Sequence, residues 1–370
     1  MTNHIITGKQ MQSIIVMFWL GSLIVLGANK EAKQDFWISI LLATVMFLPF
    51  MWLYIRLISL YPGMNLFEIL FQIFGKVFGR IMSLLFVVFA IHLGGQLVRI
   101  FSEFISIVNM PETPEALTAS VLMLFVVWSV KNGPENIGRV SKYTWVMLGI
   151  FIPFTFIVGM KDMKFSNLMP IMNTDFKSLL GSSYSFLTLP LGQAILCLSF
   201  FSAVDKTVKP WKIFIKALII SITITLVVVL RNIFILGPSV VSLFYFPSYE
   251  AVSIMTSGEF FSRFEVLIGI NLMLAGFIKT CVCLYSASLG LAKVLNVTDQ
   301  KTLAVPCALL FVTLSGLLYK NTQEWVGWIK YYQFYSIPFQ IILPVITLIG
   351  AEIQTRIKSA ASGGQKKTES

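Results

Sequence analysis

The amino-acid sequence predicts an all-α integral membrane protein with about ten transmembrane helices. Of its 370 residues, 56% are hydrophobic and only 12% are charged, and the mean hydropathy is +0.82. A soluble domain needs more charge than this, because its surface must be solvated. The apolar residues also gather in segments of about 20 residues, which is the length a helix needs to cross the hydrocarbon core.

Ten apolar segments, separated by short polar loops, are the predicted spans. They run over 10–28, 36–60, 81–107, 116–130, 140–160, 182–204, 212–236, 265–292, 304–318 and 336–357. We therefore expect residues 1–370 to form a single transmembrane domain with two five-helix halves, at 10–160 and 182–357. The last residues, 359–370, are polar, which predicts a disordered tail.

Basic residues set the orientation that we predict for these spans. Most of the 28 Lys and Arg residues fall in loops on the side of the N-terminus, and fewer fall on the opposite side. By the positive-inside rule, both termini are predicted to be cytoplasmic. The net charge of +11 is interpreted as topology-setting charge and not as a nucleic-acid surface, because no basic run with interleaved aromatics occurs.

Two segments outside the spans also have a predicted structure. Apolar residues of 66–74 recur at helical spacing just after Tyr61-Pro62-Gly63, which predicts a short amphipathic helix at the cytoplasmic interface. Residues 249–262 mix apolar and acidic side chains. They form either an interfacial, gate-like helix over the eighth span or an ordered loop.

Cysteine and histidine patterns indicate neither a metal site nor a catalytic site. All four cysteines lie in apolar stretches and are interpreted as buried small hydrophobes. They are Cys197, Cys281, Cys283 and Cys307. The two histidines, His4 and His92, have no metal-ligand spacing with them. No nucleophile elbow, zinc-protease motif or P-loop occurs, so we predict no enzyme, no cofactor and no metal.

A polar stripe runs along the third span. His92, Gln96, Arg99 and Glu103 follow one another at steps of four, three and four residues, which places them on one face of a helix. Arg99 and Glu103 can form an ion pair along the helix. The stripe is predicted to have a structural or gating role, because ionisable groups inside a span face a partner or a cavity.

Lys279 lies near the middle of the eighth span, and no acidic residue is within one helical turn of it. An ammonium at this depth needs carbonyls, hydroxyls or a carboxylate from another helix. Three roles are open: it replaces a coupling cation, it binds a substrate carboxylate, or unwound backbone carbonyls satisfy it. Asn271 and Thr280 are weaker candidates for lining the same cavity.

Helix-breaking residues occur in the first and sixth spans. The first has Gly21-Ser22 near its centre and Gly27 further on, and the sixth has Pro190 and Gly192 two residues apart. Broken helices at matching positions of two halves indicate a binding site at the membrane midplane. Exposed backbone amides there hold a carboxylate, and exposed carbonyls hold an ammonium.

Three stretches carry a resemblance to a known family that extends over residues 7–358. They are RIFSEFISIVNMPETP (99–114), YPGMNLFEI (61–69) and SRFEVLIGI (262–270). With the ten spans and the two breaks, the chain resembles the B subunit of spore germinant receptors. That family of spore germination permeases is a branch of the amino acid–polyamine–organocation transporter superfamily.

The resemblance implies a fold, a location, partners and a pocket. It implies a five-plus-five inverted repeat of the LeuT-like kind in the spore inner membrane, beside germinant receptor A and C subunits. It also implies that the chain senses a small nutrient, such as an amino acid, between the unwound parts of the first and sixth helices. Carried onto this chain, the pocket positions are Gly21, Ser22, Leu23, Leu189, Pro190, Leu191, Asn271 and Met273. Gly192 and Lys279 join them on the grounds given above.

The chain departs from some relatives at the first break. They have a form like GAGVLTLP, whereas this chain reads GSLIVLGA, with Leu23 in place of a second glycine and Ala28 in place of a proline. Because a leucine there crowds a small ligand, either the nutrient differs or ligand binding is weakened or absent.

Three functions remain in view from the sequence. The first is a nutrient-sensing receptor subunit that triggers germination through its partners, because this chain has no soluble output domain. The second is a permease that moves an amino acid or similar solute by alternating access. The third is a conduit for ions, lined by the stripe of the third span.

Overall fold

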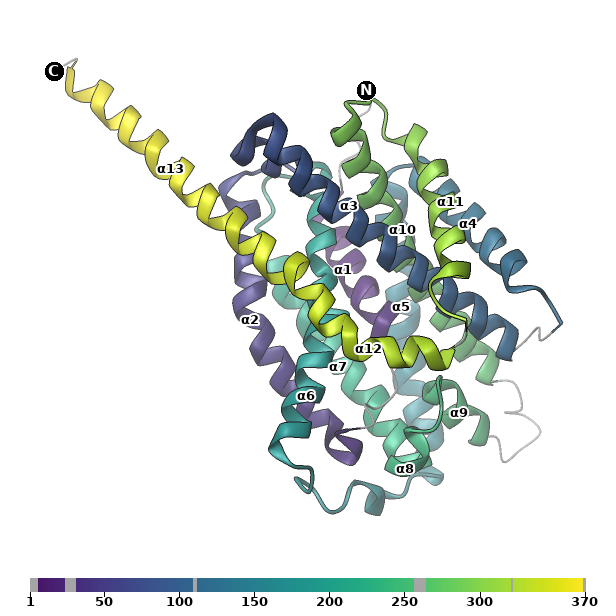
Figure 1. The fold of residues 1–370 in the computed structure, drawn as a ribbon. Coiled ribbons are helices and arrows are strands. Elements are labelled where there is room, and N and C mark those ends of the chain that lie inside the picture. The colour runs from purple at the N-terminus through teal and green to yellow at the C-terminus, as the bar shows by residue number, and fades with distance from the viewer. Residues whose placement is uncertain (1–5, 24–30, 109–111, 256–263, 321, 369–370) are drawn as a thin grey trace.

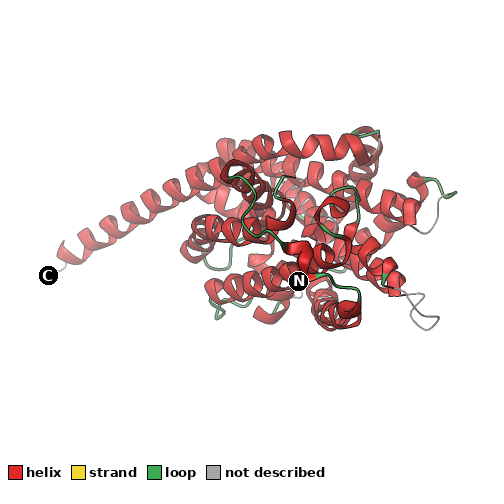
Figure 2. Ribbon diagram, turned by 90° about the horizontal axis from the view of Figure 1, so that it is seen from below, coloured by secondary structure: helices red, strands yellow, loops and turns green. Residues whose placement is uncertain are grey.

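The computed structural model describes residues 6–23, 31–108, 112–255, 264–320 and 322–368. These residues are almost entirely helical, and Figure 2 shows no strand among them. One isolated β-bridge joins Ile6 to Val204. The predicted all-α class is therefore confirmed.

The helices follow the predicted spans closely. They are α1 (Gly8–Leu23), α2 (Phe36–Leu60), α3 (Leu66–Val108), α4 (Glu115–Lys131), α5 (Pro134–Val158), α6 (Phe176–Phe186), α7 (Pro210–Leu236), α8 (Pro238–Val241), α9 (Pro247–Ile254), α10 (Phe264–Leu295), α11 (Lys301–Leu317), α12 (Thr322–Ile337) and α13 (Leu343–Thr368). Short helical turns complete them: η1 (Lys33–Asp35), η2 (Gly159–Lys161), η3 (Phe165–Leu168), η4 (Leu187–Leu191), η5 (Gly192–Ala203) and η6 (Pro338–Ile342). Each predicted span coincides with one helix or with a run of them.

Length and composition support a multi-pass membrane protein. Among the described residues, seven helical stretches are long and apolar enough to cross a membrane. The other three predicted spans fall on α1, α4 and α11, which have 16, 17 and 17 residues. Large apolar side chains such as Trp52, Phe78, Phe125 and Trp128 are exposed on the outside of the bundle, while many Ser and Thr side chains are buried. Lipid solvates the first group, and internal hydrogen bonds satisfy the second.

Helix α1 lies at the centre of the bundle. It contacts α5, α7 and α10, and its side chains from Ile14 to Leu20 are fully buried (Figure 1). Around it, the most extensive helix–helix interface is between α3 and α10. These two helices and α1 therefore position whatever lies in the middle of the molecule.

The short helix predicted over 66–74 is the first part of α3. Gly75 separates it from the rest of α3, because its φ of 72° and ψ of −167° break the helix. Its apolar face packs into the bundle and not into lipid, since Phe67 is fully buried and its ring lies against Gly290 of α10. The 249–262 segment is helical over α9, which contacts α7 and α10; its part at 256–262 lies outside the described residues.

The C-terminal helix differs from the prediction. The backbone of α13 stays helical to Thr368, into the segment assigned to a disordered tail, and projects away from the bundle (Figure 1). Extending an existing helix is cheaper than nucleating a new one, so a polar continuation needs no packing partner to be helical. The division into repeats at 10–160 and 182–357 stays a prediction.

Helix α6 begins at a capped N-terminus. The carboxylate of Asp175 accepts a hydrogen bond from the Ser178 amide at 3.0 Å, which also lowers the pKa of Asp175. From there the sixth span enters the bundle through Ser182 and Ser183, which are fully buried.

Glycine permits the close approach of α3 and α10, and this gives a first prediction. A Cβ on Gly276 would overlap the ring of Phe101, which is 1% exposed and packed among other buried side chains. We expect Gly276→Ala to lower the free energy of unfolding by about 1–3 kcal/mol through overpacking. The measurement is the thermal unfolding midpoint of the purified protein in detergent.

Gly316→Ala on α11 is the matched control. A Cβ on Gly316 meets no atom within 4 Å, so this change should leave the midpoint unchanged or raise it slightly. Equal midpoints for the two variants would contradict the prediction that the packing of the Phe101 ring requires a glycine at position 276.

Candidate functional site

At the centre of the bundle, Gly21 brings α1 against α10. A Cβ built on Gly21 would lie 2.8 Å from the carbonyl oxygen of Ala275 and 3.0 Å from the Cβ of Lys279. A larger residue would therefore push the two helices apart. Because Gly21 allows this approach, the next residue, Ser22, reaches the side chain of Lys279.

The sixth span departs from α-helical geometry where the sequence predicts a break, although the chain stays helical from Phe176 to Ala203. After α6, η4 is a π-helical turn that contains Pro190, and η5 continues as a 3₁₀ helix. Proline has no amide proton to donate, and π and 3₁₀ turns leave carbonyls directed away from the regular α-helical pattern. The break lies entirely inside the protein, since all of Leu187–Leu191 is buried.

Side chains from three other elements hold the broken segment. The Trp19 indole of α1 donates to the Leu191 carbonyl at 3.2 Å. The Tyr54 hydroxyl of α2 lies 3.2 Å from the carbonyl of Gly192 and 2.7 Å from that of Gln340. In addition, the Gln340 amide of η6 donates to the Thr188 carbonyl at 2.7 Å. The irregular backbone is thus hydrogen-bonded without water, as a membrane interior requires.

Lys279 is the charged group at this centre. It is fully buried, and its ammonium donates to the Ser22 hydroxyl and to the Gln193 side-chain oxygen, the latter at 2.5 Å. Its Nζ lies 4.8 Å from the centre of the Phe18 ring, a cation–π contact. The Gln193 amide donates onward to the Tyr332 hydroxyl at 2.7 Å. All these partners are uncharged, and no described carboxylate forms an ion pair with Lys279.

A small cavity lies beside Lys279. The space open to the centres of water molecules is about 30 Å³, which is room for about two waters. Its lining comes from α1, α3, the sixth span, α10 and α12: Gly21, Ser22, Leu93, Gln96, Leu97, Ile100, Phe101, Leu189, Gln193, Lys279 and Trp325. The protein is therefore in a closed conformation around this centre, because an amino acid does not fit in a volume of this size.

The predicted ligand residues reach this cavity in part. Gly21, Ser22, Leu189 and Lys279 line it. The adjoining segment of altered helical geometry contains Pro190, Leu191 and Gly192. Gly192 must lack a side chain, because a Cβ there would overlap the Gln340 amide. The side chain of Leu23, and Gly27 and Ala28, lie outside the described residues.

Two predicted residues lie elsewhere. Asn271 comes eight residues before Lys279, about 12 Å along the helix, and lines a separate cavity with α5, α7 and α9. Met273 is half-buried and does not line the central cavity. The assignment of both to the central pocket is thus not supported by the structure, because both lie about two turns closer to the N-terminal end of α10.

Sequence reasoning missed Gln193 and Trp325. Gln193 directly follows the Pro190–Gly192 break, so a polar residue at the end of a break was the signal that could have found it. Trp325 comes from α12, a helix far along the chain, and only the packing of the bundle brings it over the cavity.

The polar stripe of α3 serves several partners. Gln96 lines the cavity and donates to the Tyr319 hydroxyl at 2.8 Å. The ring of His92 lies edge-on to Tyr335, with 4.8 Å between the ring centres. The stripe therefore has two parts. His92 and Gln96 contact aromatic side chains and the cavity, whereas Arg99 and Glu103 form an ionic part.

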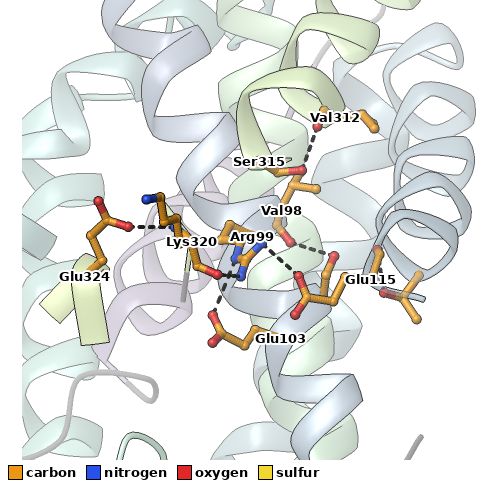
Figure 3. A network of polar contacts seen from close by, with 10 residues as sticks. Val98, Arg99, Glu103, Glu115, Val312, Ser315, Lys320 and Glu324 are labelled. Carbon is orange, nitrogen blue, oxygen red and sulfur yellow. Dashed lines mark hydrogen bonds and ion pairs between the residues drawn. The ribbon is translucent and has the colours of Figure 1, made fainter. Parts of the chain in front are cut away.

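Arg99 is the residue that connects the groups of the ionic part, and we call this cluster the Arg99 hub (Figure 3). Its guanidinium lies 3.6 Å from the Glu103 carboxylate and 2.8 Å from that of Glu115 on α4, and it donates to the Lys320 carbonyl at 3.0 Å. The predicted pair with Glu103 is present, while Glu115, the nearer partner, comes from another helix. Arg99 thus joins α3, α4 and the segment between α11 and α12.

The second prediction concerns this hub. Arg99→Ala removes a mostly buried cation that pairs with both Glu103 and Glu115, so we expect it to lower the free energy of unfolding by about 3–5 kcal/mol and to reduce protein abundance in the membrane. Arg139→Ala is the control, because Arg139 also has a 2.8 Å pair with a glutamate but is exposed. That change should cost at most about 1 kcal/mol. Equal losses for the two variants would contradict a structural role for the hub.

Comparisons with known proteins come from sequence and from structure. The family model described as "Spore germination protein" matches residues 5–324. The putative spore germination protein YfkT of Bacillus subtilis (strain 168) is 25% identical over 340 residues, with 91% of each chain covered. Spore germination protein KB of the same organism is 23% identical over 365 residues, which cover 97% of this chain and 98% of the relative.

Solved structures show the same fold at low sequence identity. Mhp1, a nucleobase-cation-symport-1 family transporter in a closed conformation with bromovinylhydantoin bound, superposes with a TM-score of 0.67 and 11% identity, over 94% of this chain and 78% of that chain. MhsT, in complex with L-phenylalanine, superposes with a TM-score of 0.60 and 12% identity, over 91% of this chain and 97% of that chain. These likenesses confirm the LeuT-like transporter fold.

Proposed function

This chain belongs to the spore germination protein family, and from that premise we propose that it is the nutrient-sensing subunit of a spore germinant receptor. It binds a small nutrient, such as an amino acid, in the central cavity and triggers germination through A and C partner subunits. We place it in the inner membrane of the spore, with both termini in the cytoplasm. It needs no cofactor, and its partners do not include nucleic acid.

The observation that carries the proposal is the environment of Lys279. A buried ammonium whose partners are the uncharged Ser22 and Gln193 has its hydrogen bonds but no negative charge. A ligand carboxylate would supply that charge and would replace one neutral acceptor with a stronger, charge-assisted one. The segment beside it, at Pro190–Gly192, has carbonyls that now accept from Trp19 and Tyr54 and that a ligand ammonium would take over on binding. This combination favours a zwitterionic amino acid, and the L-phenylalanine in the MhsT structure is a ligand of that class.

Ligand binding in this cavity requires a conformational change. The present volume of about 30 Å³ holds water but not a nutrient. A ligand therefore binds a more open state and shifts the population toward it, by as much as its affinities for the two states differ. Trp325 and Phe101, which line the cavity from α12 and α3, are the bulky side chains that must move to enlarge it. Partner subunits would sense that displacement.

A permease that works by alternating access is the second candidate. The observation that favours it is the transporter fold shared with Mhp1 and MhsT. Lys279 would then occupy the place of a coupling cation and permit transport without sodium.

The decisive experiment is nutrient-triggered release of dipicolinic acid from spores that lack this protein, with the wild-type chain restored as the reference. We expect loss of the response to one nutrient class among amino acids, sugars and nucleosides. Uptake of that same nutrient into proteoliposomes holding this chain alone then separates the two candidates. Binding without uptake supports the receptor, and saturable uptake supports the permease. Unchanged release with every nutrient would contradict the sensing role.

A third prediction tests the ligand site at Lys279. Lys279→Met removes the ammonium but keeps most of the side-chain volume, so it should not lower protein abundance. We expect it to raise the nutrient concentration for half-maximal release by about tenfold or more, because a charge-assisted hydrogen bond is lost.

Thr280→Val is the matched control for Lys279→Met. Thr280 is the next residue on α10, is fully buried and donates to the Gly276 carbonyl within its own helix, away from the cavity. This variant should respond to nutrient like the wild type. A normal response from Lys279→Met at normal abundance would remove Lys279 from the ligand site.

A further inference from the structure

A second, smaller cavity lies among α5, α7, α9 and α10. Its lining consists of Leu148, Ile152, Val228, Arg231, Ser248, Ile268 and Asn271. The space open to water centres is about 10 Å³, enough for a single particle of about the size of a water molecule. Apolar side chains from α5, α7 and α10 form most of the wall, and the polar groups of the lining come from Arg231, Ser248 and Asn271.

Arg231 brings a buried positive charge to this cavity. It is 1% exposed, and its guanidinium donates to the Thr155 hydroxyl at 2.7 Å, to the Asn232 side-chain oxygen and to the Ser248 carbonyl at 3.3 Å. Nε donates one of these bonds, Nη1 donates one and Nη2 donates two. The guanidinium has five N–H groups, so one N–H on Nη1 has no acceptor among the described residues. All the acceptors are neutral, and no ion pair to Arg231 exists among the described residues.

Two further donors line the cavity. Asn271 is 2% exposed, yet neither its amide nitrogen nor its amide oxygen has a hydrogen-bond partner among the described residues. The Ser248 hydroxyl accepts a bond from the Asn232 amide at 3.1 Å, which leaves its own proton to donate. A buried polar group without a partner costs about 1–3 kcal/mol, so a vacant cavity between these groups would be unfavourable.

We propose that this cavity binds a monatomic anion, with chloride as the natural occupant. Arg231 supplies the positive charge, and the Asn271 amide and Ser248 hydroxyl supply neutral N–H and O–H donors. The space of about 10 Å³ is smaller than that at Lys279 and matches a monatomic ligand better than a carboxylate or a phosphate, which separates this site from the nutrient cavity. A water molecule fits the same space and satisfies both atoms of Asn271, but it leaves the buried guanidinium without a counterion, which is the costlier deficit.

The site has a structural consequence that does not depend on the identity of the nutrient. Arg231 already ties α7 to Thr155 of α5 and to Ser248, next to the start of α9. An anion that also contacts Asn271 ties α10 into the same cluster. Since α10 carries Lys279 two turns further along, the anion fixes the helix that bears the central charge.

The test is thermal unfolding of the purified full chain, in sodium chloride and in sodium gluconate of equal ionic strength. Chloride should raise the unfolding midpoint in a saturable way, by roughly 2 °C or more, because the ligand binds the folded state. Asn271→Asp places a carboxylate in the cavity, so it should unfold at the same temperature in both salts. Asn271→Leu should weaken the chloride effect. Lys279→Met, which removes the other buried cation, should keep it.

Direct binding keeps the proposal testable if a variant folds poorly. Radioactive chloride should bind the wild type and Lys279→Met, and unlabelled bromide should displace it. Identical unfolding in the two salts together with no bound chloride would mean that the cavity holds water only, and would overturn the proposal. Loss of chloride binding in Lys279→Met but not in Asn271→Leu would place the anion in the central cavity instead, and would overturn it equally.

Discussion

A lysine ammonium buried at the centre of the bundle constrains every element around it. Lys279 is fully buried among packed side chains, so the protein must bring it acceptors from other helices. Ser22 reaches Lys279 because Gly21 lets α1 approach α10, and Gln193 reaches it from the start of the 3₁₀ segment, just after the π-helical turn. The position of α1 and the geometry of the sixth span thus both supply a hydrogen-bond acceptor to the Lys279 ammonium.

The broken helix is stable because its freed carbonyls are accounted for. Trp19, Tyr54 and Gln340 come from α1, α2 and η6, and each hydrogen-bonds to backbone at or beside the break. These side chains therefore replace the water that such a segment would need in a soluble protein. They also tie the segment to three other parts of the bundle, α1, α2 and η6.

Three buried or partly buried cations differ in whether a carboxylate pairs with them. Arg99 has two carboxylates and a carbonyl, and it joins helices near the C-terminal end of α3. Lys279 and Arg231 have only neutral acceptors among the described residues, and each lines a cavity. Because an uncompensated buried charge is costly, these two cations are the basis of both ligand proposals. The cavity beside Lys279 is the larger of the two.

The predicted break at Gly21-Ser22 is wrong, because α1 stays α-helical to Leu23. Local patterns in the sequence were nevertheless enough to predict the spans, the departure from α-helical geometry at Pro190–Gly192, the Arg99–Glu103 pair and a lysine inside the eighth span. These features depend on residues within one or two helical turns, and hydrophobicity, helix breaking and spacing along a helix report them directly. The tertiary structure alone decided that Gln193 and Trp325 face the central cavity, that Glu115 is the nearer partner of Arg99, and that Asn271 belongs with Arg231. Each of these depends on which helix faces meet across the bundle, and that is set by packing between residues far apart in the chain.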